Sequence, residues 1–305
     1  MGLSRAAALV IVNPAAGGGH AGRTWARARR ALGDLEAAYT CVQTSRPGEA
    51  TDLAREAVRG GVERVIAVGG DGTVSAVADG LAGSQTALGV VPAGTGNDVV
   101  RALRLPTDPG RAARLALQSQ PGWIDVGRVQ VADRTASLVS VAGCGFDAEV
   151  VRRTGTGRAG GGTLPYLASV LRVVWTFRPR RLRLELDDGR TVERQALGVA
   201  IANGPCYGGG LRIAPAAAVD DGLFDVCLVG ALRPWGLLAL LPRLYAGAHA
   251  GHRAVEFFRC RELVVEAADD APATCCHADG ELLGRLPARF WIEPRGLRCV
   301  LGPAA

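Results

Sequence analysis

The chain contains no lysine: all 35 of its basic side chains are arginines, set against 29 acidic ones. The resulting net charge of +6 suits a nucleic acid, an anionic membrane or a polyphosphate ligand equally well. A lysine-rich tail and a basic motif interleaved with aromatic residues are both missing. Nothing therefore selects nucleic acid, and we expect no nucleic-acid partner.

The sequence also lacks an uncharged apolar stretch of membrane-spanning length, so we expect no transmembrane helix. The apolar run 6–12 follows Arg5 as a signal segment would, but it ends in Asn13-Pro14 and not at a small-residue cleavage site. We interpret this run as a first buried strand and expect a cytoplasmic protein.

No Cys-x-x-Cys pair occurs among the eight cysteines, and several of them lie in apolar runs, where cysteine acts as a small core residue. We expect a reducing compartment and no disulfide framework. Cys275-Cys276-His277 lacks the spacing of a metal site, and His249-x-x-His252 lacks a third ligand. A zinc site is therefore not expected.

At 305 residues the chain exceeds the usual size of a single core, which predicts two domains. Between residues 7 and 118, strand-like and helix-like patterns alternate, which predicts a parallel sheet with helices on both faces. The predicted strands are 7–12, 38–43, 64–68 and 87–91, and the predicted helices are 23–32, 48–59, 74–82, 98–103 and 109–118.

From about Trp123 the pattern changes to short alternating runs, which predict a mainly antiparallel second domain with a boundary near 122–127. Two apolar helical stretches, 164–177 and 234–250, interrupt it. They either cover the β core or form an apolar cleft for a greasy substrate, with arginines 178–183 facing anionic headgroups.

Two glycine-rich turns, Gly69 to Thr73 and Pro92 to Asp98, each follow an apolar strand and precede a helical pattern. Such turns lie at the carboxyl ends of adjacent strands, where open α/β sheets bind ligands. Glycine allows close backbone approach to a phosphate, helix-start amides attract the anion, and Asp71 can reach a metal. Two such turns in consecutive units predict a nucleotide phosphate site.

The segment after the first strand also matches, at Gly17 to Thr24, both the Gly-x-Gly-x-x-Gly and the P-loop spacing. Arg23 stands where the P-loop requires lysine, and the second strand leads to Gln43-Thr44-Ser45 without the acidic residue of a dinucleotide fold. We interpret both matches as coincidences around a simpler phosphate-facing turn.

Taken together, these motifs resemble the soluble diacylglycerol-kinase-type lipid kinases, which include bacterial lipid kinases and sphingosine and ceramide kinases. Gly-Gly-Asp-Gly-Thr alone is shared with NAD kinases and phosphofructokinase relatives, but its combination with Pro-x-Gly-Thr-x-Asn-Asp and a late Asp-Gly-Glu is specific. The matching segments run from residue 7 almost to the C-terminus in consistent order: Asn13 to Gly17, Thr44 with Gly48-Glu49-Ala50, Gly69 to Ser75, Pro92 to Asp98, Ile124 to Gly127, Gly143 to Asp147, Asn203 with Tyr207 to Gly210, Ala214 to Ala217, Asp221 to Leu223, and Asp279 to Glu281.

The resemblance implies an α/β N-terminal nucleotide-binding domain, NAD-kinase- and phosphofructokinase-like, over residues 1–124. A mainly antiparallel β-sandwich would follow over 125–287, with strands of 288–305 returning to the first domain. ATP would bind in the cleft between the domains. The residues that would line it are Asn13, Pro14, Ala15, Ala16, Gly17, Thr44, Gly69, Gly70, Asp71, Gly72, Thr73, Val74, Ser75 and Thr95.

The resemblance further implies that Glu281 accepts the acceptor's proton. Asp71 is the rival candidate, because it is expected beside the phosphates and could serve either the metal or the alcohol. Mg²⁺ would be held by the Asp221 carboxylate and the backbone carbonyls of Ala218 and Leu223. Ala15-Ala16 replaces a more polar pair, so only backbone hydrogen bonds are expected there.

Several of the same carboxylates have simpler interpretations. Asp125 and Asp147 also suit turns or helix caps, and Asp221 and Asp279 each suit the first position of an Asp-Gly turn.

The expected activity is an ATP- and Mg²⁺-dependent phosphorylation of a lipid hydroxyl, most simply diacylglycerol to phosphatidic acid. The expected partners are a lipid substrate at the membrane surface, through peripheral contact, and a second copy of the chain, a homodimer being left open. An NAD kinase and a non-catalytic lipid-binding relative are the alternatives. The Asp-Gly-Glu and Tyr-Gly-Gly-Gly segments disfavour the first, and the joint presence of Asp71, Asp221 and Glu281 disfavours the second.

Overall fold

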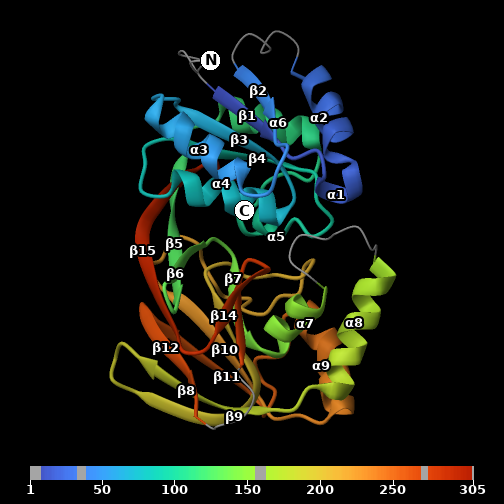
Figure 1. Cartoon of the computed structure of the whole chain (residues 1–305), viewed down its shortest axis with the longest axis vertical. Coiled ribbons are helices and arrows are strands. Elements are labelled where there is room, and N and C mark those ends of the chain that lie inside the picture. Colours follow the sequence, from blue (N-terminus) through green and yellow to red (C-terminus); the bar gives the residue numbers. More distant parts are fainter. Residues whose placement is uncertain (1–7, 33–38, 155–162, 269–273, 304–305) are drawn as a thin grey trace. The chain divides into compact units, whose positions relative to one another are not determined.

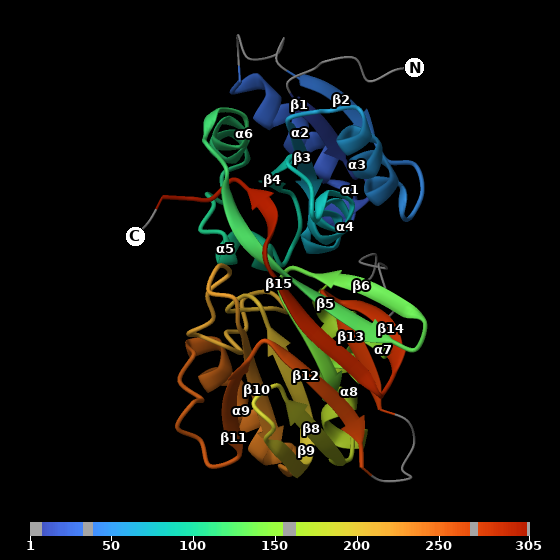
Figure 2. The same cartoon turned by 90° about the vertical axis from the view of Figure 1, so that its left-hand side faces the viewer.

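The structure is a computed structural model and describes residues 8–32, 39–154, 163–268 and 274–303. The chain forms two compact units (Figures 1 and 2). Unit 1 comprises Met1–Val126 with Pro294–Ala305, and unit 2 comprises Gly127–Glu293. Strand β5 (Gly122–Val131) carries the chain out of unit 1, and strand β15 (Ala288–Cys299) brings it back.

Unit 1 contains a parallel sheet, which confirms the predicted α/β class. Its strand order is β2-β1-β3-β4, and Cys299 at the end of β15 pairs in parallel with Leu88 of β4. Residues of β1 and β4 are buried throughout, as expected for strands covered on both faces. The four strands are β1 (Ala8–Val12), β2 (Tyr39–Gln43), β3 (Arg64–Gly69) and β4 (Ala87–Pro92).

Helices cover the sheet of unit 1 in two pairs. Trp25 of α2 and Ala113 of α6 share one core cluster with Val10 and Ile66 of the sheet. Helices α3 and α4 pack closely against each other because Gly80 has no side chain, and a side chain there would overlap Ala54. The helices are α1 (Ala16–Gly19), α2 (Ala21–Arg30), α3 (Glu49–Arg59), α4 (Asp71–Leu81), α5 (Asp98–Ala102) and α6 (Pro109–Gln118).

Unit 2 is built from antiparallel pairs, as predicted. Its strands run in the order β14-β13-β7-β9-β8-β12-β15, with β10 paired to β9 and β11 paired to β10. The central core includes the fully buried rings of Phe224 and Phe290. The strands are β6 (Arg134–Leu138), β7 (Val141–Gly145), β8 (Arg180–Leu186), β9 (Thr191–Ala202), β10 (Phe224–Gly230), β11 (Val255–Cys260), β12 (Glu262–Ala267), β13 (Cys275–Ala278) and β14 (Glu281–Arg285).

Three helices accompany these strands: α7 (Phe146–Thr154), α8 (Thr163–Thr176) and α9 (Pro234–Ala246). The prediction that α9 extends to residue 250 is wrong, because Gly247 takes a left-handed φ of 70° and its amide closes the helix end. Figure 1 shows α8 and α9 side by side in unit 2, and residues of the two helices are in contact. No helix in the described ranges is long and apolar enough to cross a bilayer.

Candidate functional site

Backbone hydrogen bonds tie together the loops at the carboxyl ends of the parallel strands in unit 1. The Thr44 amide donates to the Val12 carbonyl (2.9 Å), and the Asn13 amide donates to the Val68 carbonyl (3.1 Å). The Ala93 amide likewise donates to the Gly69 carbonyl (2.8 Å). The loops that carry the predicted ATP-binding residues therefore gather at one edge of the sheet.

Asn13 fastens the first of these loops to helix α4. Its side-chain Nδ2 donates to the hydroxyl of Thr73 (2.9 Å), while its Oδ1 accepts from the Ala15 amide (3.1 Å). Thr73 is buried, and a Cβ on Gly69 would lie 2.4 Å from its Oγ1. Asn13 and Thr73 thus position the loops through a side-chain contact across 60 residues of sequence.

The glycines of these loops permit contact between backbones. A Cβ on Gly94 would lie 2.4 Å from the Cα of Gly70, and one on Gly70 would lie 3.1 Å from the Cα of Gly94. Gly17 has a φ of 60°, and its Cβ would lie 2.2 Å from the carbonyl oxygen of Ala93. The sequence explained these glycines by approach of a ligand, and the structure adds that the loops themselves require them.

Asp71 lies in the first turn of α4, three residues before the predicted start of that helix. Gly70 is the extended residue before the helix, and its carbonyl accepts the amides of Thr73 (2.9 Å) and Val74 (3.1 Å). The Asp71 Oδ1 accepts from the Val99 amide (2.9 Å) in the first turn of α5. The acidic side chain therefore connects the beginnings of two helices.

The second glycine-rich turn is closed by Asn97, which has a φ of 54°. Asn97 accepts the Gly94 amide (3.1 Å) and donates to the Gly94 carbonyl (2.9 Å). Among the described residues, none accepts a hydrogen bond from the amides of Thr95 or Gly96, and the Thr95 side chain is exposed. Those two amides are therefore available to an acceptor from outside the chain.

The remaining predicted ATP-lining residues differ in accessibility. The side chain of Val74 is almost fully buried in the core, and its amide donates to the Gly70 carbonyl. Ala15 and Gly72 are exposed, and Pro14, Ala16 and Ser75 are partly buried.

In unit 2 the Asp-Gly turn between β13 and β14 is held by its own aspartate. Asp279 has a φ of 47°, and its carboxylate accepts the amides of Val139 (2.9 Å), Ser140 (2.9 Å) and Val141 (3.1 Å). The interpretation of Asp279 as a turn residue is confirmed. Its consequence is that the next β-strand, which Glu281 begins, is fixed against the chain before β7.

Glu281 presents its carboxylate to solvent, with 68% of the side chain exposed. Its closest charged neighbour is Arg134 of β6, whose guanidinium lies 3.4 Å from the carboxylate. Exposed pairs of this kind are weak, so the arginine can be displaced by an incoming group. The carboxylate is therefore accessible to an acceptor hydroxyl.

His277 lies beneath the same turn, and sequence reasoning assigned it no role. It is buried, its Nδ1 accepts the Gly280 amide (3.4 Å), and its Nε2 lies 3.5 Å from the Asp147 carboxylate. Its ring stacks on that of Tyr207, with 6.4 Å between centroids. His277 thus supports the turn from below. In the sequence, only its position two residues before the Asp-Gly turn could have indicated this role.

The expected metal-binding aspartate is paired with an arginine. The Asp221 Oδ1 accepts the Leu223 amide (3.1 Å), and its Oδ2 accepts from the guanidinium of Arg259. Arg259 also lies 3.6 Å from the carboxylate of Asp225, whose pKa is raised by burial. The described residues contain no cluster of three or more histidine, cysteine or acidic side chains able to hold an ion. A cation held by Asp221 with the Ala218 and Leu223 carbonyls would have to displace Arg259, so these residues, as placed, do not fit a metal site.

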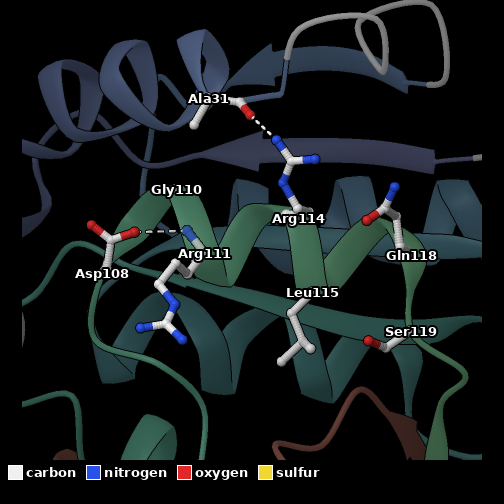
Figure 3. Close-up of a pocket in the computed structure, with 8 residues that line it drawn as sticks. All are labelled: Ala31, Asp108, Gly110, Arg111, Arg114, Leu115, Gln118 and Ser119. Atoms are coloured by element: carbon white, nitrogen blue, oxygen red, sulfur yellow. Dashed lines mark hydrogen bonds between the residues drawn. The ribbon is translucent and has the colours of Figure 1, made fainter.

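A hollow of about 370 Å³ is lined by residues of α6, by Asp108 and Ser119 at its ends, and by Ala31 (Figure 3). Asp108 there accepts the Arg111 amide and so caps the helix, and Arg114 donates to the Ala31 carbonyl. None of the predicted ATP-lining residues lines this hollow.

Two family descriptions match the chain and together span most of it. Residues 7–129 match the diacylglycerol kinase catalytic domain, and residues 140–301 match the YegS C-terminal NAD kinase beta sandwich-like domain. The fold and the grouped loops thus define a lipid kinase with a catalytic α/β unit and a β-sandwich unit.

Similar proteins agree with this class. A protein of Mycobacterium tuberculosis named diacylglycerol kinase is 35% identical over 257 residues, covering 84% of this chain and 82% of its own length. A probable YegS-like lipid kinase of Stenotrophomonas maltophilia is 32% identical, covering 82% of each chain. The fold resembles the crystal structure of a putative diacylglycerol kinase from Bacillus anthracis, with a TM-score of 0.78, 22% identity, and coverage of 97% of this chain and 95% of that one. The chain belongs to the family of diacylglycerol kinases and YegS-like lipid kinases.

Proposed function

We propose that this kinase transfers the γ-phosphate of ATP to the hydroxyl of diacylglycerol, forming phosphatidic acid. The observation that carries the proposal is the interlocking of the glycine-rich loops at the carboxyl ends of β1, β3 and β4. Phosphoryl transfer requires the phosphates to be held in one position and their charge to be offset. Loops that are bonded to one another can provide such a rigid cradle.

The phosphate donors in this proposal are main-chain amides. The amides of Thr95 and Gly96 and the amides at the start of α4 carry partial positive charge. They would attract the phosphate anion. Mg²⁺ bound to ATP would supply charge neutralisation at the phosphates. Asp71 begins α4 at this edge of the sheet and is the side chain we assign to the Mg²⁺-ATP complex.

Glu281 is the proposed proton acceptor for the lipid hydroxyl. Its carboxylate is accessible, and the Asp279 anchor fixes the strand from which it projects. A general base contributes about 10²–10⁴-fold to a rate of this kind. Diacylglycerol is proposed as acceptor because a similar protein of M. tuberculosis bears that name.

The experiment measures transfer of radiolabelled phosphate from ATP to diacylglycerol, monoacylglycerol, sphingosine, ceramide, phosphatidylglycerol and NAD. We expect diacylglycerol to be the preferred acceptor. Preference for another lipid would change the substrate within the same class, whereas labelling of NAD alone would overturn the proposal.

The base assignment is tested with Glu281→Gln. We expect kcat to fall by about 10²–10⁴-fold with ATP affinity nearly unchanged, because the amide keeps the shape but accepts no proton. Glu256→Gln is the matched control, since Glu256 is likewise a glutamate paired with an arginine, Arg194, and its side chain is 41% exposed. If Glu281→Gln keeps near-normal turnover while Asp71→Asn loses turnover with ATP binding intact, the base is Asp71.

A further inference from the structure

The large hydrophobic side chains most exposed to solvent in the described ranges all lie on α8 or α9. They are Leu171 (40% exposed), Trp175 (46%), Trp235 (70%) and Tyr245 (53%). The rings of Trp175 and Trp235 form an edge-to-face pair with centroids 4.9 Å apart. Exposed apolar groups gathered in this way mark an interaction surface, and indole rings favour the boundary between water and lipid headgroups.

Positive charge without acidic neighbours in sequence accompanies these aromatic rings. Neither segment 163–184 nor segment 226–255 contains an aspartate or glutamate. The side chains of Arg172, Arg178 and Arg233 are exposed and have no ion-pair or hydrogen-bond partner among the described residues. Such arginines are available to anionic groups of a partner.

Not all arginines of this region contribute. Arg181 and Arg183, which the sequence placed in the same headgroup-facing cluster, are paired on β8 with Glu193 and Glu185. The arginines available to a partner therefore lie near the C-terminal end of α8 and the N-terminal end of α9, and not on β8. The sequence marked both apolar stretches but could not show that α9 contacts α8, because that contact joins segments about 60 residues apart.

An apolar cavity of about 310 Å³ lies between the C-terminal end of α8 and the N-terminal end of α9. Its apolar wall includes Val174, Phe177 and Leu237, and both Arg178 and Arg233 contribute to its lining. The apolar wall would suit the hydrocarbon part of a ligand, and the two arginines beside it would suit a phosphate group. That combination fits a phospholipid better than it fits a wholly polar partner.

We propose that the ends of α8 and α9 form a docking face for an anionic lipid bilayer. Trp175 and Trp235 enter the headgroup boundary, and Arg172, Arg178 and Arg233 bind phosphates. The inference rests on the proposed function, because a kinase whose acceptor is diacylglycerol meets that acceptor in a bilayer. Each arginine contributes about fivefold to binding at low salt, and the effect is screened as salt is added.

The test is sedimentation with vesicles of phosphatidylcholine alone or with phosphatidylglycerol added, at low and high salt. We expect tighter binding to the anionic vesicles, and a loss of about 25-fold in Arg178→Gln/Arg233→Gln. Trp175→Ala/Trp235→Ala should lose binding and also the fluorescence quenching caused by brominated lipid. Arg59→Gln/Arg111→Gln is the charge-matched control, since both arginines are exposed on helices of unit 1.

Thermal melting of each variant confirms that it is folded. The docking face is overturned if wild type binds neutral and anionic vesicles equally well. It is also overturned if Trp175→Ala/Trp235→Ala binds anionic vesicles as tightly as wild type does. The proposal would also be overturned if wild type does not bind vesicles but forms a concentration-dependent dimer, and Trp175→Ala/Trp235→Ala stays monomeric. The face would then bind a second copy of the chain.

Kinase assays separate this inference from the proposed function. The docking variants should phosphorylate a water-soluble, short-chain diacylglycerol normally while losing activity toward long-chain diacylglycerol in anionic vesicles. If short-chain diacylglycerol is phosphorylated but the variants bind vesicles as wild type does, the docking face is wrong and the function stands. If no diacylglycerol is phosphorylated yet the variants lose vesicle binding, the function is wrong and the docking face stands.

Discussion

Replacing Gly94 by alanine tests whether the phosphate cradle depends on direct contact between loops. The added Cβ would lie 2.4 Å from the Cα of Gly70 and 3.0 Å from the Oδ1 of Asn97. Carbon atoms are in comfortable contact at about 3.5–4.0 Å, so the two loops must separate by roughly 1 Å. Because Gly70 contributes only backbone at this point, no side-chain rotation can relieve the overlap.

The expected cost has a stability part and a catalytic part. Overpacking of this kind costs about 1–3 kcal/mol, which lowers Tm by roughly 3–10 °C for a protein of this size. A displacement of about 1 Å in a positioning element can cost about 10²-fold in turnover. We therefore expect Gly94→Ala to be folded, less stable, and about 10²-fold poorer in kcat/KM for ATP.

Calorimetric melting and steady-state kinetics with varied ATP measure both effects. Gly22→Ala is the control, because a Cβ at that position of α2 meets nothing within 4 Å. Alanine within a helix is favoured over glycine by about 1 kcal/mol, so Tm of the control should stay level or rise. A Gly94→Ala protein with the melting temperature and ATP kinetics of wild type would refute the interlocked loops.

Two further predictions concern charges in unit 2. Arg259→Met should destabilise the protein by about 1–3 kcal/mol, since Asp221 and the buried Asp225 lose their counter-charge. Because a cation can then bind Asp221 without displacing an arginine, Mg²⁺ should raise the Tm of this variant in scanning fluorimetry. An equal effect of Mg²⁺ on the Tm of wild type would contradict the role given to Arg259. Burial lowers the pKa of His249 below 6.5, so the unfolded chain takes up the proton first and stability should fall as pH drops below about 6.5, by at most about 1.4 kcal/mol per pH unit. Urea denaturation between pH 7.5 and 5.5 should show that His249→Phe lacks this slope, and the same slope in the variant would exclude His249 as its source.

The sequence by itself determined the alternation of strand and helix in unit 1, because hydrophobic periodicity and glycine-rich turns are local properties of the chain. It also determined the family, since motifs such as Gly69 to Thr73 and Asp279 to Glu281 keep their order along the chain. It placed the start of α4 too late. Gly70 caps that helix without a side chain, so no capping residue signals where it begins.

Tertiary structure decided which of the motif residues bind one another. The contacts of Gly94 with Gly70, Asn13 with Thr73, and Asp279 with the amides before β7 join segments far apart in sequence. No periodicity encodes such pairs, because they depend on how strands lie beside one another in the sheet.

The same holds for the charges and for the aromatic face. Arg259 lies opposite Asp225 through the register of β10 and β11, and its guanidinium also pairs with Asp221. Trp175 meets Trp235 because α8 packs on α9. The sequence could name these side chains as acidic, basic or aromatic, but only the packing of distant segments determines which charges are neutralised within the protein and which remain available to a partner.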